Sequence, residues 1–228
     1  MATLLLHLSA PLQSWGAESK FEVRRTMNFP TKSGVLGLVA AALGYSREDS
    51  DSLKKLNTLK FGIRIDHQGE LLRDFHTAKT KKDAYVTKRF YLADAIFLAG
   101  LESQDIGFLN QIKNALKHPA FPLFLGRRSC PPTMPLFLGI RDTDLLASLR
   151  TEPWLLDESK QKQFRNTKLR IITDSDIPTE VIRDVPVSFS KLNRRFNFRN
   201  VTEEYINADT VATVTAENIV ATAHDPFA

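Results

Sequence analysis

The chain has 228 residues, of which 43% are hydrophobic, and 31 Lys and Arg against 26 Asp and Glu give it a formal net charge of +5. This length fits one large domain or two small ones, and so mild a charge permits an anionic partner without requiring one. The single cysteine excludes an intrachain disulfide and a cysteine-rich metal site, and neither a signal peptide nor a membrane-length apolar run occurs, so we expect a cytoplasmic protein without membrane contact.

The first 44 residues predict a strand, a long polar loop and a helix. Residues 2–9 are leucine-rich and short, as in a central strand. Apolar residues spaced i, i+3, i+4 and i+7 then predict a helix that ends before Gly44. Its start offers two hydroxyls, a cation and free backbone N–H groups, which could hold a phosphate at Thr31, Lys32, Ser33 and Gly34. The alternative is a capped core helix whose lysine points to solvent.

The middle of the chain predicts strands on either side of a basic insertion. Residues 59–66 alternate apolar and polar, which predicts a half-buried strand with Arg64 and Asp66 on the solvent side. A Gln-Gly turn follows, and residues 70–77 could return as the partner strand. Residues 78–90 are basic and lack a core pattern. The pattern beyond them predicts a strand at 91–101, a helix at 103–118 and a strand at 136–140.

This order predicts an α+β fold. Strand, helix, strand, inserted hairpin, strand, helix and strand form the βαββαβ arrangement of ferredoxin-like or RRM-like domains, with a basic β-hairpin at about 70–91 between the second and third strands. We expect this domain to span residues 1–141. A smaller, β-rich C-terminal segment, 142–228, should pack on it, with short strands at 168–173 and 181–189.

Motifs of common catalytic and metal sites are absent from the sequence. No Gly-x-Ser-x-Gly, His-Glu-x-x-His or Cys-x-x-Cys occurs, the five histidines lack metal spacing, and we expect neither a cofactor nor a metal. One alternative stays open, in which His76, Lys79 and Tyr85 cleave RNA without a metal by general acid–base catalysis on a 2′-hydroxyl. His76 could instead form a local hydrogen bond, or contact RNA without cleaving it.

Clustered cations favour nucleic-acid binding over catalysis. Four groups occur: in the basic insertion, at a Gly-Arg-Arg turn, among phenylalanines near residue 195, and just before the first helix. Arginine suits phosphate because its planar fork binds two oxygens, and neighbouring aromatics can stack on bases. A single group is more often a solvated surface, but four in one chain indicate binding. Their members are Lys79, Lys81, Lys82, Lys88 and Arg89, with Tyr85, Phe90 and Tyr91 beside them; Arg127 and Arg128; Arg194 and Arg195; and Arg24 and Arg25.

Five short motifs occur in an order that resembles one family. They are PLQSWG at 11–16, FPTKSGVLGL at 29–38, RDFHT at 73–77, YLADA at 91–95 and LGRRSCP at 125–131. The set resembles the CasD family, the fifth Cas subunit of the type I-E CRISPR surveillance complex, Cascade. The resemblance runs from residue 2 to about residue 140 and is looser beyond residue 150.

The resemblance implies an RRM-like domain with a protruding thumb, in a non-catalytic subunit that holds the 5′ handle of the CRISPR RNA and caps one end of the complex. The implied partners are that RNA, the adjacent backbone subunit, the large subunit and, indirectly, target DNA near the 5′ end of the guide. A type I-C relative is an endoribonuclease, which keeps RNA cleavage as the alternative. Bases of the handle would lie near Gln13, Ser14 and Trp15 (a Trp before Gly is also often a core residue), and phosphates at Arg25, Lys32, Ser33, Arg127 and Arg128.

Overall fold

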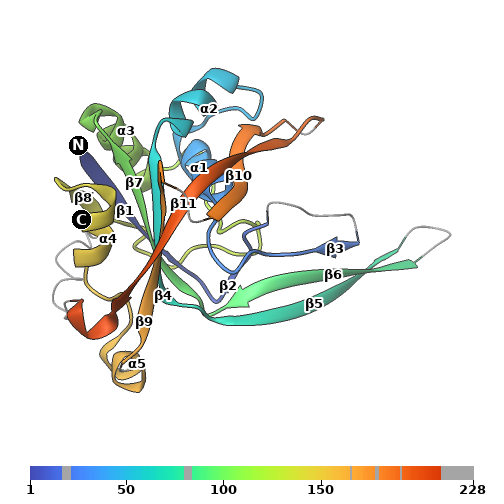
Figure 1. Ribbon diagram of the computed structural model, residues 1–228. Helices are drawn as coiled ribbons and strands as arrows, with labels where there is room; N and C mark the ends of the chain where they lie inside the picture. The colour runs from blue at the N-terminus through green and yellow to red at the C-terminus, as the bar shows by residue number, and fades with distance from the viewer. Residues whose placement is uncertain (17–21, 80–83, 165, 178–179, 191, 212–228) are drawn as a thin grey trace, which may run out of the picture.

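The computed structural model describes residues 1–16, 22–79, 84–164, 166–177, 180–190 and 192–211. Its main feature is a twisted seven-stranded sheet with the order β10-β11-β9-β4-β7-β1-β8, in which neighbouring strands are antiparallel (Figure 1). The predicted α+β class is confirmed. The strands are β1 (Ala2–Ser9), β4 (Lys60–His67), β7 (Ile96–Ser103), β8 (Phe137–Arg141), β9 (Lys168–Asp174), β10 (Glu180–Ser188) and β11 (Arg195–Asn207).

Helices cover both faces of this sheet. α1 (Lys32–Leu43) contacts α2 (Ser50–Asn57) and α3 (Ile106–Lys117) on one face, whereas α4 (Leu145–Thr151) packs on β1, β4, β7 and β9 from the other. The short α5 (Glu158–Gln163) and a 3₁₀ turn, η1 (Ala208–Thr210), lie at one end of the sheet (Figure 1). No helix of the described ranges is long and apolar enough to cross a membrane.

The predicted limits of the first helix are confirmed. Thr31 is the N-cap of α1, and its hydroxyl accepts a hydrogen bond from the Gly34 N–H. Gly44 ends the helix in the left-handed region, at φ 76°, which glycine adopts without a steric penalty. The short α2 follows, and the Asp49 side chain caps it by accepting a hydrogen bond from the Ser52 N–H.

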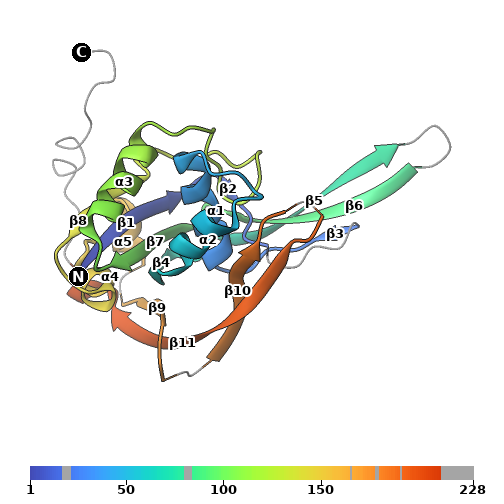
Figure 2. The ribbon, with the colours of Figure 1, turned by 90° about the horizontal axis from the view of Figure 1, so that it is seen from above.

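A long hairpin projects from one end of the sheet. β5 (Glu70–Lys79) and β6 (Ala84–Ala93) pair over their full lengths, and we call this hairpin the arm (Figures 1 and 2). Two short strands, β2 (Leu12–Gln13) and β3 (Val23–Arg24), pair with the other edge of β6. Both figures show the arm extending well away from the helices.

The strand predicted as half-buried is buried on both faces, so that prediction was wrong. Arg64 and Asp66 of β4, expected in solvent, are 0% and 3% exposed. The reason is that α4 and the segment after it cover this face. The Arg64 guanidinium binds the Asp66 carboxylate at 2.6 Å and donates to the carbonyls of Leu149, Glu152 and Pro153.

Two other strand predictions also need correction. The apolar stretch 91–101 is divided between β6 and β7 at Asp94, whose φ of 54° turns the chain from the arm into the sheet. Residues 70–77 pair with β6 and not with β4. In the C-terminal part, β9 hydrogen-bonds to β4, so β9, β10 and β11 continue the main sheet. The division of the chain near residue 141 stays a prediction.

Candidate nucleic-acid interface

The loop residues expected near RNA bases are buried and bonded within the chain. Gln13 donates to the carbonyls of Ala95 at 2.7 Å and Leu8 at 3.2 Å, and its side-chain oxygen accepts from Trp15 Nε1 at 3.0 Å. Gln13, Ser14 and Trp15 are each at most 3% exposed. A base near this loop would therefore meet the surface around these three side chains. In the free chain these side chains hold the loop in place, since the Ser14 hydroxyl donates to the Phe90 carbonyl of β6.

The start of α1 is occupied by groups of the chain itself. The Lys32 N–H donates to Asp184 Oδ2 at 2.8 Å, and Lys32 Nζ lies 2.7 Å from Asp174 Oδ2. Helix N-termini favour negative charge, which the Asp184 carboxylate supplies here. Gly34 packs against the Trp15 indole, where an added Cβ would lie 2.7 Å from a ring carbon. A phosphate at Thr31, Lys32, Ser33 and Gly34 would have to displace this carboxylate.

These contacts belong to a larger buried ion network, formed by Lys32, Asp174, Asp184 and Arg199. The Arg199 guanidinium binds Asp184 at 2.6 and 3.0 Å and Asp174 at 2.7 Å, and the Phe61 N–H donates to Asp174. Burial alone would lower the pKa of Arg199, but the two carboxylates outweigh burial and raise it. Two cations and two anions balance, and they join α1 to β9, β10 and β11.

A second group of cations lies where the arm meets the body, and we call it the basic edge. It comprises Arg24 on β3, Lys88 and Arg89 on β6, and Arg127 and Arg128 of the Gly-Arg-Arg turn. Val23 and Arg24 pair with Lys88 and Arg89, and the Arg127 guanidinium donates to the Arg24 carbonyl at 2.9 Å. Within the described part of the chain, Nε of Arg89 and Nη1 of Arg127 are buried without a hydrogen-bond partner.

Tyr91 is the aromatic centre of the basic edge. The Arg127 guanidinium lies 4.5 Å from the centroid of its ring, within cation–π range. Burial alone would raise the pKa of Tyr91, but Arg127, Ser129 and Arg89 stabilise the phenolate more strongly, and the pKa is lowered. Excess positive charge at this partly exposed edge is what a phosphate group would neutralise.

The turn that supplies Arg127 is held close to the PLQSWG loop. Gly126 has φ 86°, and a Cβ there would lie 1.7 Å from the Ser14 carbonyl oxygen. The Ser14 N–H donates to the Leu125 carbonyl at 3.1 Å. Only glycine fits this approach, so the first residue of the Gly-Arg-Arg turn has a geometric role.

The arm itself places the remaining hairpin cations in solvent. Lys79 and Lys88 are exposed, and Lys81 and Lys82 lie outside the described residues. The register pairs His76 with Thr87 and Ala78 with Tyr85, so His76 and Tyr85 share one face of the arm. Lys79, one residue after Ala78, lies on the opposite face. His76 Nε2 is 2.6 Å from Asp74 Oδ2, which gives it a local ionic partner.

Three further findings concern sites away from the basic edge. Arg194 lies in the β10–β11 connection, with its guanidinium 5.1 Å from the Phe196 ring centroid, and Arg195 is the first residue of β11. Arg25, exposed, follows β3. Among the residues that the structure describes, no group of three or more His, Cys, Asp or Glu is placed to hold a metal.

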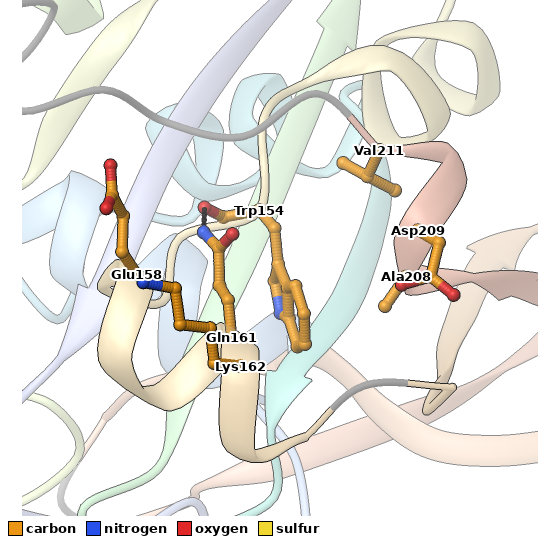
Figure 3. Close-up of a pocket in the computed structure, with 7 residues that line it drawn as sticks. All are labelled: Trp154, Glu158, Gln161, Lys162, Ala208, Asp209 and Val211. Carbon is orange, nitrogen blue, oxygen red and sulfur yellow. Dashed lines mark hydrogen bonds between the residues drawn. The ribbon is translucent and has the colours of Figure 1, made fainter.

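A surface pocket lies between α5 and η1, with Trp154 at its wall (Figure 3). Gln161 donates to the carbonyls of Trp154 and Leu156 at 3.3 and 2.6 Å. Glu158, Lys162 and Asp209 also line it, so both signs of charge are present. None of the residues predicted to bind RNA lines this pocket, which therefore is not part of the candidate interface.

Sequence reasoning missed the partners of the buried ion network and the unpaired donors of the basic edge. Asp174 and Asp184 are 142 and 152 residues from Lys32, and no local pattern connects them. The signal available was the placement of each aspartate at an inward position of a strand, where a lone charge needs a partner.

Comparison with known proteins assigns the chain to a class of CRISPR proteins. A model of the family described as CRISPR-associated protein Cas5 matches residues 3–202. The CRISPR system Cascade subunit CasD of Escherichia coli strain K12 is 37% identical over 159 residues, which are 60% of this chain and 70% of that protein.

Solved structures agree with this assignment. A structure titled as a crystal structure of a Cas protein has a TM-score of 0.73 and 36% identity, covering 93% of this chain and 98% of the other. A chain of a CRISPR RNA-guided surveillance complex has a TM-score of 0.77 and 31% identity, covering 95% of each. The chain belongs to the Cas5 family of CRISPR-associated proteins.

Proposed function

We propose that this chain is a non-catalytic, CRISPR RNA-binding subunit of a type I-E Cascade complex, in which it holds the 5′ handle of the guide and caps one end. The similarity to CasD, named as a Cascade subunit, and to a chain of an RNA-guided surveillance complex supports this proposal. The partners would be the CRISPR RNA, the backbone subunit and the large subunit, with target DNA near the guide 5′ end reached indirectly. Such a complex would act in the cytoplasm.

The single observation that carries RNA binding is the basic edge. Two guanidiniums with buried, unpartnered N–H donors flank an aromatic ring at the root of the arm. Both guanidiniums are partly exposed and have no carboxylate partner in the described part of the chain, so a phosphate at the surface would neutralise them through charge-assisted hydrogen bonds. The buried Tyr91 ring holds the Arg127 guanidinium in place by a cation–π contact.

The proposal extends to the roles of the arm and of the domain that bears it. The order β4-β7-β1-β8, with α1 and α3 on one face, supports an RRM-like core. The length of the arm and its basic β6 support a thumb that bends the guide where the handle meets the spacer.

The test is handle binding by a variant that lacks both guanidiniums. Arg89→Ala with Arg127→Ala should reduce the slope of log affinity against log salt by about 1.4, because each lost phosphate contact on single-stranded RNA contributes about 0.7. A matched control, Lys113→Ala with Lys117→Ala, removes two cations from α3. Equal salt slopes in the wild type and the basic-edge variant would refute phosphate binding at this position.

A further inference from the structure

The outer edge of β5 is open along the arm. Among the described strands, β5 pairs only with β6. The Lys88 N–H donates to the Glu22 carbonyl at 2.8 Å, away from β5, so the opposed residues Phe75 and Lys88 exchange no ladder hydrogen bonds. By the alternation of an antiparallel pair, the backbone groups of Arg73, Phe75 and Thr77 point outward. They form a row to which another strand can hydrogen-bond.

In the free chain, one backbone N–H in the middle of this edge is already hydrogen-bonded to a neighbouring carboxylate. The Phe75 N–H donates to Asp74 Oδ1 at 2.7 Å, and the other oxygen of this carboxylate binds His76. Charged groups on an edge oppose unwanted strand pairing. The Asp74 carboxylate occupies only the Phe75 N–H, and a docking strand would replace it there with a backbone carbonyl.

Apolar side chains accompany the open edge. Leu71 is 61% exposed and Phe75 is 70% exposed, and both lie on the same face of β5. Val86, 57% exposed, extends this face onto β6. Exposed apolar residues on an edge strand favour association with another chain.

Charge divides the arm into two edges with different partners. β5 contains two acidic and two basic residues, Glu70, Asp74, Arg73 and Lys79, and is neutral. The opposite side, β6 with β3, contributes Lys88, Arg89 and Arg24, and neither strand contains an acidic residue. A polyanion would select the β6 side, whereas a neutral, partly apolar edge suits protein.

We propose that the outer edge of β5 binds an extended segment of a neighbouring protein subunit as an added β-strand, with apolar residues of that segment at alternate positions against Leu71 and Phe75. This inference rests on the proposed function, since the neighbour is a protein of the same ribonucleoprotein complex. It assigns the two edges of the arm to two kinds of partner: RNA on β6 and protein on β5.

The test places a photo-crosslinker on each side of the arm in the assembled complex. p-Benzoylphenylalanine at Phe75 should yield an adduct with a different protein subunit that survives ribonuclease, and the same probe at Arg24, on β3 beyond β6, should yield an RNA adduct. An RNA adduct at Phe75, an adduct with a second copy of this chain, or no adduct would overturn the proposal. If the complex contains no RNA, the proposed function fails too; if RNA loads normally, only this inference fails.

Two variants then test the mode of binding. Thr77→Pro removes an outward N–H without touching the β5–β6 ladder, and should reduce the protein adduct at Phe75 about fivefold, because one intermolecular hydrogen bond is lost. Thr77→Val keeps the N–H and should leave the yield unchanged. Retention of the RNA adduct at Arg24 shows that β6 still pairs with β3 and that the arm is folded. Leu71→Asp, at an exposed position, should also reduce the protein adduct; an unchanged yield in both Thr77→Pro and Leu71→Asp would reject strand addition.

Discussion

The buried ion network and the basic edge contain the same kinds of cation in opposite electrostatic states. In the network, Lys32 and Arg199 meet Asp174 and Asp184 at 2.6–3.0 Å and are neutralised within the fold. At the basic edge, Arg89 and Arg127 lie together, each with a buried N–H donor that no described group accepts. The difference teaches that a cation beside a helix start is not a phosphate site when the fold provides an anion there.

The largest expected effect is a loss of stability when a carboxylate of the buried ion network is removed. Asp184→Ala leaves Arg199 and the Lys32 N–H without their main acceptor, and removing one partner of a buried pair costs about 3–5 kcal/mol. The free energy of unfolding, measured by urea denaturation, should fall by that amount. Asp176→Ala, at an exposed position, is the control and should change it little. Similar stabilities of the two variants would contradict a structural role for the network.

The next prediction distinguishes the buried ion network from the basic edge by two measurements, the free energy of unfolding and the salt dependence of RNA binding. Lys32→Met should lower the free energy of unfolding by about 1–3 kcal/mol, because Asp174 loses one buried partner, and should leave the handle affinity of folded protein unchanged. Arg128→Ala, at an exposed residue, should do the reverse: stability stays, and the salt slope of RNA binding falls by about 0.7.

One outcome of these two measurements would contradict the assignment of phosphate to the basic edge. A shallower salt slope in Lys32→Met, with Arg128→Ala unaffected, would return the phosphate to the helix start. It would mean that RNA displaces the Asp184 carboxylate from α1, and that the free chain and the bound chain differ at this position.

Local pattern sufficed for several elements of the fold. Leucine density predicted β1, whose Leu4 and Leu6 enter the core under α1 and α3 while Leu5 enters the one under α4. Periodicity predicted α1 with its Thr31 and Gly44 ends, and most of α3. These features depend on neighbours within a few residues, which the sequence displays directly.

Features that depend on distant partners escaped prediction. The alternating pattern of β4 suggested a solvent face, but α4, about 80 residues later, covers it and binds Arg64. β11 was overlooked because its arginines and phenylalanines looked like a binding surface, whereas Arg199 is an inward residue paired with Asp184. The cations of the basic edge were predicted in three separate groups, and only folding joins Arg24, Arg89 and Arg127.

A smaller effect tests the cost of leaving a buried polar atom unpaired. His7 Nε2 is buried with no partner in the described ranges, and burial lowers the pKa of His7 below 6.5, against the opposing influence of Asp66 and the Pro135 carbonyl. Below pH 6.5, His7 therefore binds a proton more readily in the unfolded chain than in the folded chain. Stability should be full above pH 6.5 and fall as the pH decreases below it. Urea denaturation at several pH values should show this slope, and His7→Leu should remove part of it; an unchanged slope would exclude His7 as its source.

The last prediction is that no RNA cleavage occurs, and it tests whether the arm only binds RNA or also cuts it. His76 is held by Asp74, and Tyr85 shares its face, but Lys79 lies on the other face, so the three groups do not converge on one 2′-hydroxyl. General acid–base cleavage needs its proton donor and acceptor within hydrogen-bond reach of the same reacting group. Repeat RNA incubated with purified protein and a chelator should therefore stay intact on a denaturing gel. A single cut that His76→Ala abolishes would instead make the arm an endoribonuclease site, and the basic edge would then be the surface that positions its substrate.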